Sequence, residues 1–342
     1  MTTEASTITI SCLCETAHQT LPSPTDLSDV TCCGCASCRH LSGQLWTTYT
    51  PLASPPSLAN LTSYSPSPST TTYFCSTCGC HLFRRHSDTH EPRWEVTTGT
   101  IISSPPIPLP EALTITTTTT HDKPTPTATN EPLSTSLYRL FTPLLSPALS
   151  PAPLPPLLHA SCHCTRITFT ITPPSASSFL PSSPFADLLL PYCRHPPNVT
   201  SNPSSLKWWL RDPYLAGTCA CRSCRLASGF EAQAWAFVPR FNIHFGPTAD
   251  PLVTFPRPLL QSYASSPAAG AVREFCPTCG ATVFWHDAHR PDLIDVSVGL
   301  LCASSDCEGS SPVAAAYPYL YWWTERTSFA EESAAGQSFN AP

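Results

Sequence analysis

The stretch CGCASCRHLSG at residues 33–43 recurs as CACRSCRLASG at residues 219–229. Both copies follow the frame C-x-C-x-S-C-R-x-x-S-G. Cysteines so close in sequence cannot easily pair with one another, but their thiolates can converge on one metal ion. The recurrence therefore predicts two homologous metal-binding domains within one chain.

Further cysteines surround each stretch in the same order, with a C-x-C before it and an F-C-x-x-C-G after it. Fourteen of the nineteen cysteines belong to this double series. They are Cys12, Cys14, Cys33, Cys35, Cys38, Cys75 and Cys78 in the first copy, and Cys162, Cys164, Cys219, Cys221, Cys224, Cys276 and Cys279 in the second. Because Thr218 stands where the first copy has Cys32, the ligand candidate is Cys33, and Cys32 is interpreted as an incidental thiol.

Seven thiols are too many for one tetrahedral site, and they divide most simply into four plus three. The C-x-C and C-x-x-C pairs of each copy give a closed, structural Cys₄ zinc site. These four-cysteine sites are Cys12, Cys14, Cys75 and Cys78, and Cys162, Cys164, Cys276 and Cys279.

The three remaining thiols of each copy form a cysteine triad. The triads are Cys33, Cys35 and Cys38, and Cys219, Cys221 and Cys224. Zinc with three protein ligands keeps a fourth position open, as in catalytic sites. The alternatives are a site closed by a fourth protein ligand and a labile metal.

Two kinds of residue beside the cysteines recur in both copies. Gly79 and Gly280 follow the C-x-x-C knuckles, where we expect a positive φ, and the Phe before each knuckle is expected to anchor it in the core. Arg39 and Arg225 adjoin the triads. A cation there would lower a thiol pKa or hold an anionic ligand; the alternative is a salt-bridge or capping residue.

The composition limits the classes of function. The 342 residues suffice for two domains, the net charge is −6, and 12% of residues are charged, without a Lys/Arg run. This argues against nucleic-acid and anionic-membrane partners, which require clustered positive charge. Since the sequence shows neither a secretory signal nor an 18-residue apolar run, we expect a cytoplasmic protein, with the nucleus also open. Abundant cysteines then indicate metal ligands in a reducing compartment.

Short β-branched and aromatic runs bounded by Gly and Pro predict a mainly β protein. The 41 prolines concentrate at 51–70, 102–156, 173–204 and 247–267, which predicts loops, linkers or disorder there. We assign residues 6–120 to domain 1, 121–156 to a Pro/Thr-rich linker, and 157–330 to domain 2. Residues 113–115 are a candidate last strand of domain 1.

The combined cysteine motifs resemble the family of glutathione-dependent formaldehyde-activating enzymes and centromere protein V. The resemblance covers about two thirds of the chain and leaves out the Pro-rich insertions. It implies two tandem Mss4-like β-tent zinc domains, with zinc as the cofactor at about two ions per domain. One departure is that family members usually carry Gly directly after the first C-x-C, where this chain has Glu15 and Thr165.

The resemblance also implies an activity. The triads match the family's catalytic zinc position, and the reaction joins glutathione and formaldehyde to S-hydroxymethylglutathione, as a carbon–sulfur lyase. Glutathione would be substrate or ligand, with Arg39 and Arg225 as candidate contacts to it, and the partners would be small thiols and aldehydes. The alternative is a non-catalytic tandem zinc module for protein interaction; triads that are intact in both copies favour the enzyme.

Overall fold

The computed structural model of the chain describes residues 7–23, 30–87, 90–102, 114–116, 157–175, 178, 214–246, 250–251, 254–255, 257–302, 319–322 and 327–332. Strands predominate among these residues, and the α-helices are the short α1 (Ala36–Ser42) and α4 (Arg222–Ser228). The prediction of a mainly β protein is confirmed.

The strands of domain 1 are numbered β1 to β9, and a single 3-10 turn, η1, follows β8. They are β1 (Thr7–Ile10), β2 (Gln19–Pro22), β3 (Thr31–Cys33), β4 (Thr47–Leu52), β5 (Leu61–Ser67), β6 (Thr70–Cys75), β7 (His81–His86), β8 (Arg93–Thr97), η1 (Thr98–Thr100) and β9 (Thr114–Thr116). The candidate last strand at 113–115 is thus present as β9.

Domain 2 repeats this series and adds to it. Its elements are β10 (Leu158–Ser161), β11 (Thr168–Ile171), β12 (Tyr214–Cys219), β13 (Gln233–Pro239), η6 (Arg240–Asn242), β14 (Ile243–Phe245), β15 (Asp250–Pro251), β16 (Gln261–Ser266), η7 (Pro267–Ala269), β17 (Ala271–Phe275), β18 (Thr282–His286), β19 (Leu293–Ser297), η8 (Val298–Leu300), β20 (Leu301–Cys302), β21 (Leu320–Trp322) and η10 (Ala330–Glu332).

Each domain contains a seven-stranded sheet of the same topology. The order is β5-β6-β7-β8-β4-β3-β9 in domain 1 and β16-β17-β18-β19-β13-β12-β21 in domain 2. In both sheets the last strand pairs in parallel with the strand that carries the first triad cysteine. The C-x-C segments lie in separate hairpins, β1–β2 and β10–β11, and the second of these belongs to a five-stranded sheet.

Two of the proline-rich stretches are structured, which corrects the prediction of loops there. Residues 51–70 contain β5, and residues 247–267 contain β16. Both are edge strands. In β5 this position accommodates Pro66, whose missing N–H group can face away from the neighbouring strand, whereas β16 contains no proline. Most of the stretches at 102–156 and 173–204, including the predicted linker, lie outside the described residues.

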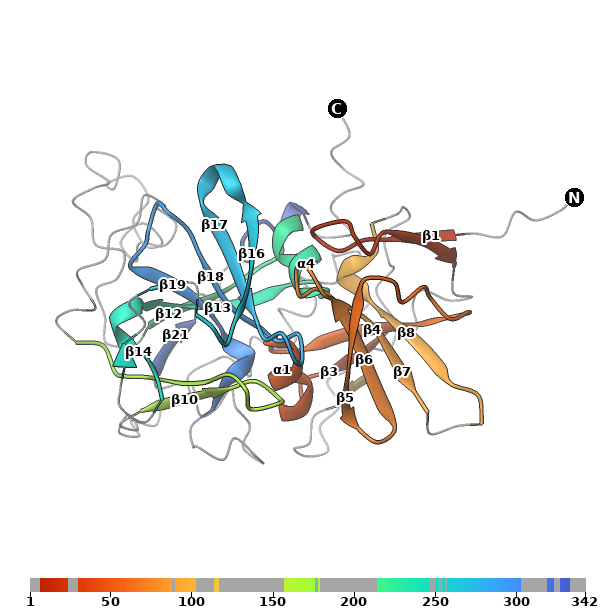
Figure 1. The fold of residues 1–342 in the computed structure, drawn as a ribbon, viewed down its shortest axis with the longest axis horizontal. Coiled ribbons are helices and arrows are strands. Elements are labelled where there is room, and N and C mark those ends of the chain that lie inside the picture. The colour runs from red at the N-terminus through yellow and green to blue at the C-terminus, as the bar shows by residue number, and fades with distance from the viewer. Residues whose placement is uncertain are drawn as a thin grey trace, which may run out of the picture.

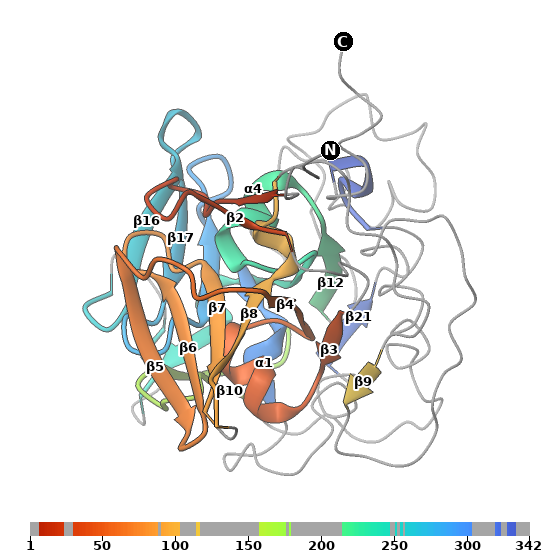
Figure 2. The same ribbon diagram turned by 90° about the vertical axis from the view of Figure 1, so that its right-hand side faces the viewer.

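The two domains pack against each other through matching contacts. Figure 1 shows α1 and α4 between the two large sheets, and Figure 2 shows the same arrangement from the side. Gly299 N–H donates to the Gly43 carbonyl at 3.0 Å, and Gly99 N–H donates to the Gly229 carbonyl at 3.0 Å. A Cβ on any of these four glycines would overlap with backbone of the other domain. Gly43 and Gly229, the last residues of the repeated frame, therefore allow the backbones of the two domains to approach closely.

The core is shared between the domains. One cluster of buried apolar side chains includes Leu82 and Val96 of domain 1 together with Val283 and Val296 of domain 2. Within the described part of the chain, the helices are too short and too polar to cross a membrane.

Candidate metal centres

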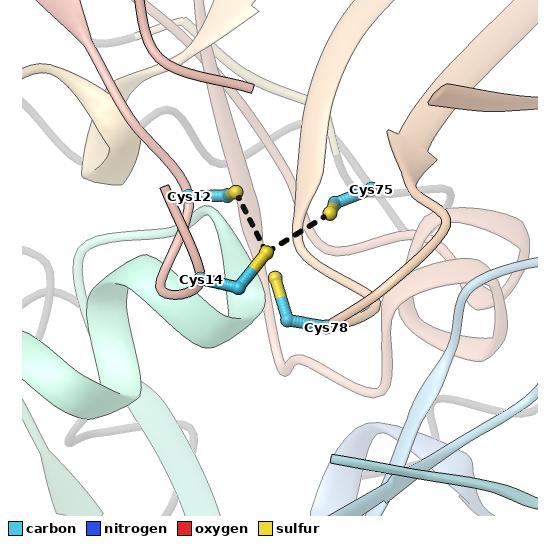
Figure 3. A group of neighbouring side chains, drawn as sticks. All are labelled: Cys12, Cys14, Cys75 and Cys78. Atoms are coloured by element: carbon cyan, nitrogen blue, oxygen red, sulfur yellow. Dashed lines mark hydrogen bonds between the residues drawn. The ribbon is translucent and has the colours of Figure 1, made fainter. Parts of the chain in front are cut away.

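The four-cysteine site of domain 1 joins two segments that are far apart in sequence. Cys12 and Cys14 follow β1, whereas Cys75 ends β6 and Cys78 closes the next turn. The Sγ of Cys14 lies 3.4 Å from the Sγ atoms of Cys12 and Cys75, and Figure 3 shows the four sulfurs turned toward one centre. Zinc–sulfur bonds of about 2.3 Å in a tetrahedron put the sulfurs about 3.8 Å apart, so these thiols fit a structural zinc ion.

Domain 2 contains the same arrangement. The Sγ of Cys164 lies 3.5 Å from the Sγ atoms of Cys162 and Cys276, and Cys279 completes a group whose ligand atoms all lie within 4.8 Å of one another. The structure thus brings together both predicted four-cysteine sets. Each set ties the hairpin of its domain to the large sheet.

The residue after each C-x-C has a left-handed backbone. φ is 64° at Glu15 and 59° at Thr165, and the amide of each donates to the carbonyl of the first cysteine, Cys12 or Cys162, at 3.1 and 2.9 Å. Glycine adopts this conformation without cost, whereas a β-branched residue such as Thr does not. The departure from glycine at this position therefore introduces backbone strain beside both structural sites.

The triads form where a strand passes into a helix. In domain 1, Cys33 ends β3, Cys35 is the N-cap of α1, and the amide of Cys38 donates to the Cys35 Sγ at 3.5 Å. Domain 2 repeats this at the N-terminus of α4, with the corresponding distance 3.3 Å. In each triad the sulfurs lie within 4.8 Å of one another, and among the described residues no His, Asp, Glu or further Cys joins them.

One thiol of each triad is favoured as a thiolate. Hydrogen bonds from Cys33 and Cys38 lower the pKa of Cys35 to about 2. In domain 2, hydrogen bonds from Cys219 and Cys221 lower the pKa of Cys224, against the effect of its burial. A ready supply of thiolate is what zinc binding requires.

Arg39 and Arg225 lie at the contact between the domains and not in an open site. Both are buried. Arg39 Nη1 donates to the Gly299 carbonyl at 3.2 Å, and Arg225 Nη1 donates to the Gly99 carbonyl at 3.0 Å. These hydrogen bonds give the recurring arginines a structural role, and their contact with glutathione stays a prediction.

The triad of domain 2 opens into a cavity of about 340 Å³. At its polar end Arg273 of β17 donates from Nη2 to Ser223 Oγ at 3.0 Å and to Cys224 Sγ at 3.5 Å. Trp235 and Trp285 line it from β13 and β18. The cavity therefore joins a cationic, thiol-rich end to aromatic walls.

The corresponding positions of domain 1 hold different residues. Arg273 and Trp285 face each other on paired strands, and at the matching pair domain 1 has Thr72 and Arg84. Domain 2 thus has its arginine on β17, beside the thiols. Domain 1 has its arginine on β7, at the position where domain 2 has Trp285.

Arg84 is held in place by several contacts. Its Cζ lies 3.8 Å from the ring centroid of Tyr49, and its Nε donates to Glu95 Oε2 at 2.6 Å. His86 Nε2 lies 3.0 Å from the same oxygen. Burial opposes ionisation of Glu95, but the hydrogen bond of His86 and the charge of Arg84 outweigh it and lower the pKa of Glu95 to about 2. A packed ion pair therefore occupies the place of the Trp285 wall.

Several other histidines and cysteines have structural positions. His286 contacts Glu274 at 3.2 Å and stacks on Phe255, as expected for a histidine outside the metal sites. Cys80 is fully buried, and burial raises the pKa of its thiol. Cys302 is disulfide-bonded, and Cys193, Cys307, Trp208 and Trp209 lie outside the described residues.

Sequence reasoning missed Arg273 and Arg290. The available signal was a difference between the copies: Arg273 precedes the second knuckle where the first copy has Thr72. A comparison that sought only shared residues could not find Arg273, because Thr72 stands at the matching position of domain 1.

The comparisons with known proteins agree with this duplication. The family model described as glutathione-dependent formaldehyde-activating enzyme matches residues 7–114 and 206–317, which is more than half of the chain. No curated protein and no solved structure matches. The second matched region begins after Cys162 and Cys164. The chain belongs to the glutathione-dependent formaldehyde-activating enzyme family and contains two copies of its domain.

Proposed function

We propose that this protein is a zinc-dependent enzyme of the carbon–sulfur lyase type that acts on adducts of glutathione and aldehydes, as in S-hydroxymethylglutathione synthesis. The observation that carries the proposal is the pair of three-thiol clusters, one of which opens into a cavity. The description of the matching family supports the choice of thiol and aldehyde as substrates.

The reaction needs a thiol and a carbonyl brought together. The carbon–sulfur bond forms as the thiol adds to the carbonyl carbon, and the thiol proton passes to the carbonyl oxygen; the reverse reaction breaks the same bond. Zinc bound by three thiolates would supply an open position for a thiolate or a carbonyl oxygen.

The residues of the protein contribute position and charge. The strand-to-helix turn holds the three thiols of the triad on one side of the cavity. Arg273 places a positive charge against Cys224 and so offsets the negative charge that thiolates collect there. The aromatic walls exclude water from the reacting groups, which strengthens these electrostatic interactions.

The proposal is tested by the exchange of formaldehyde with its glutathione adduct, measured by exchange NMR with ¹³C-formaldehyde. The zinc-loaded protein should accelerate the exchange above the uncatalysed rate, and the double variant Cys35→Ser, Cys221→Ser should lose the acceleration. Cys32→Thr is the matched control, because it removes a cysteine beside the triad and installs the residue of domain 2.

An unchanged rate in the double variant would overturn the proposal. Full zinc content without any acceleration would do the same, and would favour the non-catalytic module for protein interaction.

A further inference from the structure

The cavity of domain 2 has apolar walls that are fixed before any ligand enters. The Arg290 guanidinium forms two hydrogen bonds with Asp295, at 2.7 and 3.0 Å. Its Cζ lies 4.7 Å from the Trp285 ring centroid and 5.8 Å from that of Phe237. All four residues line the cavity. The paired charges of Arg290 and Asp295 and the two aromatic rings hold one another in place. This makes a fixed and largely apolar wall, which favours binding because little freedom is lost.

Phe329 stands at the cavity with an unusual combination of properties. It lines the cavity, yet 51% of its surface is exposed, and its φ is 56°. Non-glycine residues are held in this region only where surrounding contacts enforce it, and such residues cluster at functional sites.

The residues near Phe329 in sequence are held by the segment that carries the triad cysteines of domain 2. Ser328 N–H donates to the Thr218 carbonyl at 2.9 Å, and Ala220 N–H donates to the Ser328 carbonyl at 2.8 Å. The amide of Arg222 donates to Glu332 Oε2 at 2.9 Å. The segment 327–332 is therefore attached to the loop that carries Cys219 and Cys221, and it presents an exposed aromatic ring beside these thiols.

Among the described residues of domain 1, a charged side chain stands where domain 2 has an aromatic wall. Arg84 occupies the position of Trp285, stacks on Tyr49 and is neutralised by Glu95. The side chains of Arg84 and Glu95 are 14% and 11% exposed. A small apolar group that entered here would have to displace a buried ion pair, which is costly because each charge would lose its partner.

We propose that the two halves have divided their roles: both hold metal, but domain 2 alone receives the ligand, and this ligand is a small thiol or aldehyde that carries an aromatic or branched apolar group. Its reactive end lies at Cys219, Cys221 and Cys224, and its apolar group lies between Trp285 and Phe329. The identity of the reactive end rests on the proposed function; the confinement to domain 2 and the apolar group rest on the cavity.

The test is titration calorimetry of the zinc-loaded full chain with benzyl mercaptan and, separately, with 2-mercaptoethanol. Benzyl mercaptan should bind at about one site per chain and at least about tenfold more tightly than 2-mercaptoethanol, since burying one ring in an apolar cavity gains this much or more. Phe329→Ala should weaken benzyl mercaptan binding about fivefold through the lost ring contact. Phe241→Ala is the matched control, because Phe241 is similarly exposed, at 43%, in the same domain and does not line the cavity.

Two equal sites per chain would overturn the division of roles, and equal affinity for the two thiols would overturn the apolar ligand. Unchanged binding in Phe329→Ala, or loss of binding in Phe241→Ala, would exclude the placement at Phe329. Failure of the proposed function is distinguishable, since it would appear as tight 1:1 binding of benzyl mercaptan without acceleration of thiol–aldehyde exchange.

Discussion

The two domains place the same seven cysteines on the same elements, yet they surround their triads differently. Domain 2 has an arginine against the thiols and two tryptophans around a cavity. Domain 1 has Thr72 and a stacked Arg84–Glu95 pair at the matching positions. The cysteines that could bind metal and the residues that join the domains are shared, whereas the residues that would contact a ligand are not. In a duplicated protein, both copies must keep the residues that folding requires, whereas a single ligand-binding cavity can be enough for function.

The largest expected effect tests whether the structural sites of the two domains are equivalent. Cys75→Ser and Cys276→Ser should each remove about one zinc ion and several kcal/mol of stability, because structural zinc contributes about 10 kcal/mol or more to small domains. Elemental analysis and thermal unfolding under reducing conditions measure both quantities.

Cys80→Ser is the control, since Cys80 belongs to neither metal group. It should keep the full zinc content. A variant of one domain that loses metal while its counterpart keeps it would show that the four-cysteine sites are not equivalent.

The second prediction concerns the contact between the domains. Gly99→Ala and Gly299→Ala should each lower the free energy of unfolding by about 3 kcal/mol, because the new Cβ would overlap with the backbone of Phe230 or Gln44 across the interface. Urea denaturation measures the loss.

Gly217→Ala should change the stability little, since no atom lies within 4 Å of the position of a Cβ there. If one interface glycine tolerated alanine and the other did not, the matching contacts would not be equivalent in energy.

The glycines also show which features of the structure could be predicted from the sequence. The repeat predicted the mainly β class, the tandem domains and both cysteine groupings, because metal ligands impose fixed spacings that survive duplication. The positive φ of Gly79 and Gly280 followed from knuckle geometry and is confirmed at 78° and 79°.

The interface could not be predicted in this way. Gly43 and Gly229 recur as faithfully as the cysteines, but nothing in a linear repeat states that their neighbours come from the other copy. The position of Arg39 and Arg225 beside the triads predicts either a contact with thiolates or ligand or a salt-bridge or capping role. It does not indicate that packing directs both side chains to carbonyls of the opposite domain.

The third prediction concerns the Arg84–Glu95 ion pair of domain 1, which stands where domain 2 has Trp285. Glu95→Gln should lower the free energy of unfolding by about 1–2 kcal/mol, since Arg84 would lose its charged partner. The pKa of Glu95 is about 2 when folded and about 4.3 when unfolded. The stabilisation is therefore fully present above the unfolded value and is lost as the pH falls toward 2.

The difference in the free energy of unfolding between the parent and Glu95→Gln should accordingly shrink as the pH falls from about 4.3 toward 2. Denaturant unfolding at several pH values checks this, with the exposed Glu331→Gln as the control. A difference that stayed constant from pH 4.3 down to 2 would mean that the pKa of Glu95 is not lowered in the folded state.

The smallest expected effect compares the strained turns. Thr165→Gly should raise the free energy of unfolding by about 1 kcal/mol, because glycine adopts the left-handed conformation without the steric cost of a β-branched residue. Glu15→Gly should gain less, about 0.5 kcal/mol, since Glu is unbranched at Cβ and glycine adds freedom to the unfolded chain. Chemical denaturation of zinc-loaded protein resolves the difference, and a loss of stability in both variants would show that the side chains matter more than the strain.

The number of metal ions per chain tests most directly whether the cysteines of each domain form two metal sites. Elemental analysis of the full chain, purified under reducing conditions, should find about four zinc ions per chain, one for each four-cysteine site and one for each triad. A value of about two would contradict the account, because it would show that the triads hold no stable metal and that the cavity of domain 2 does not adjoin a zinc site.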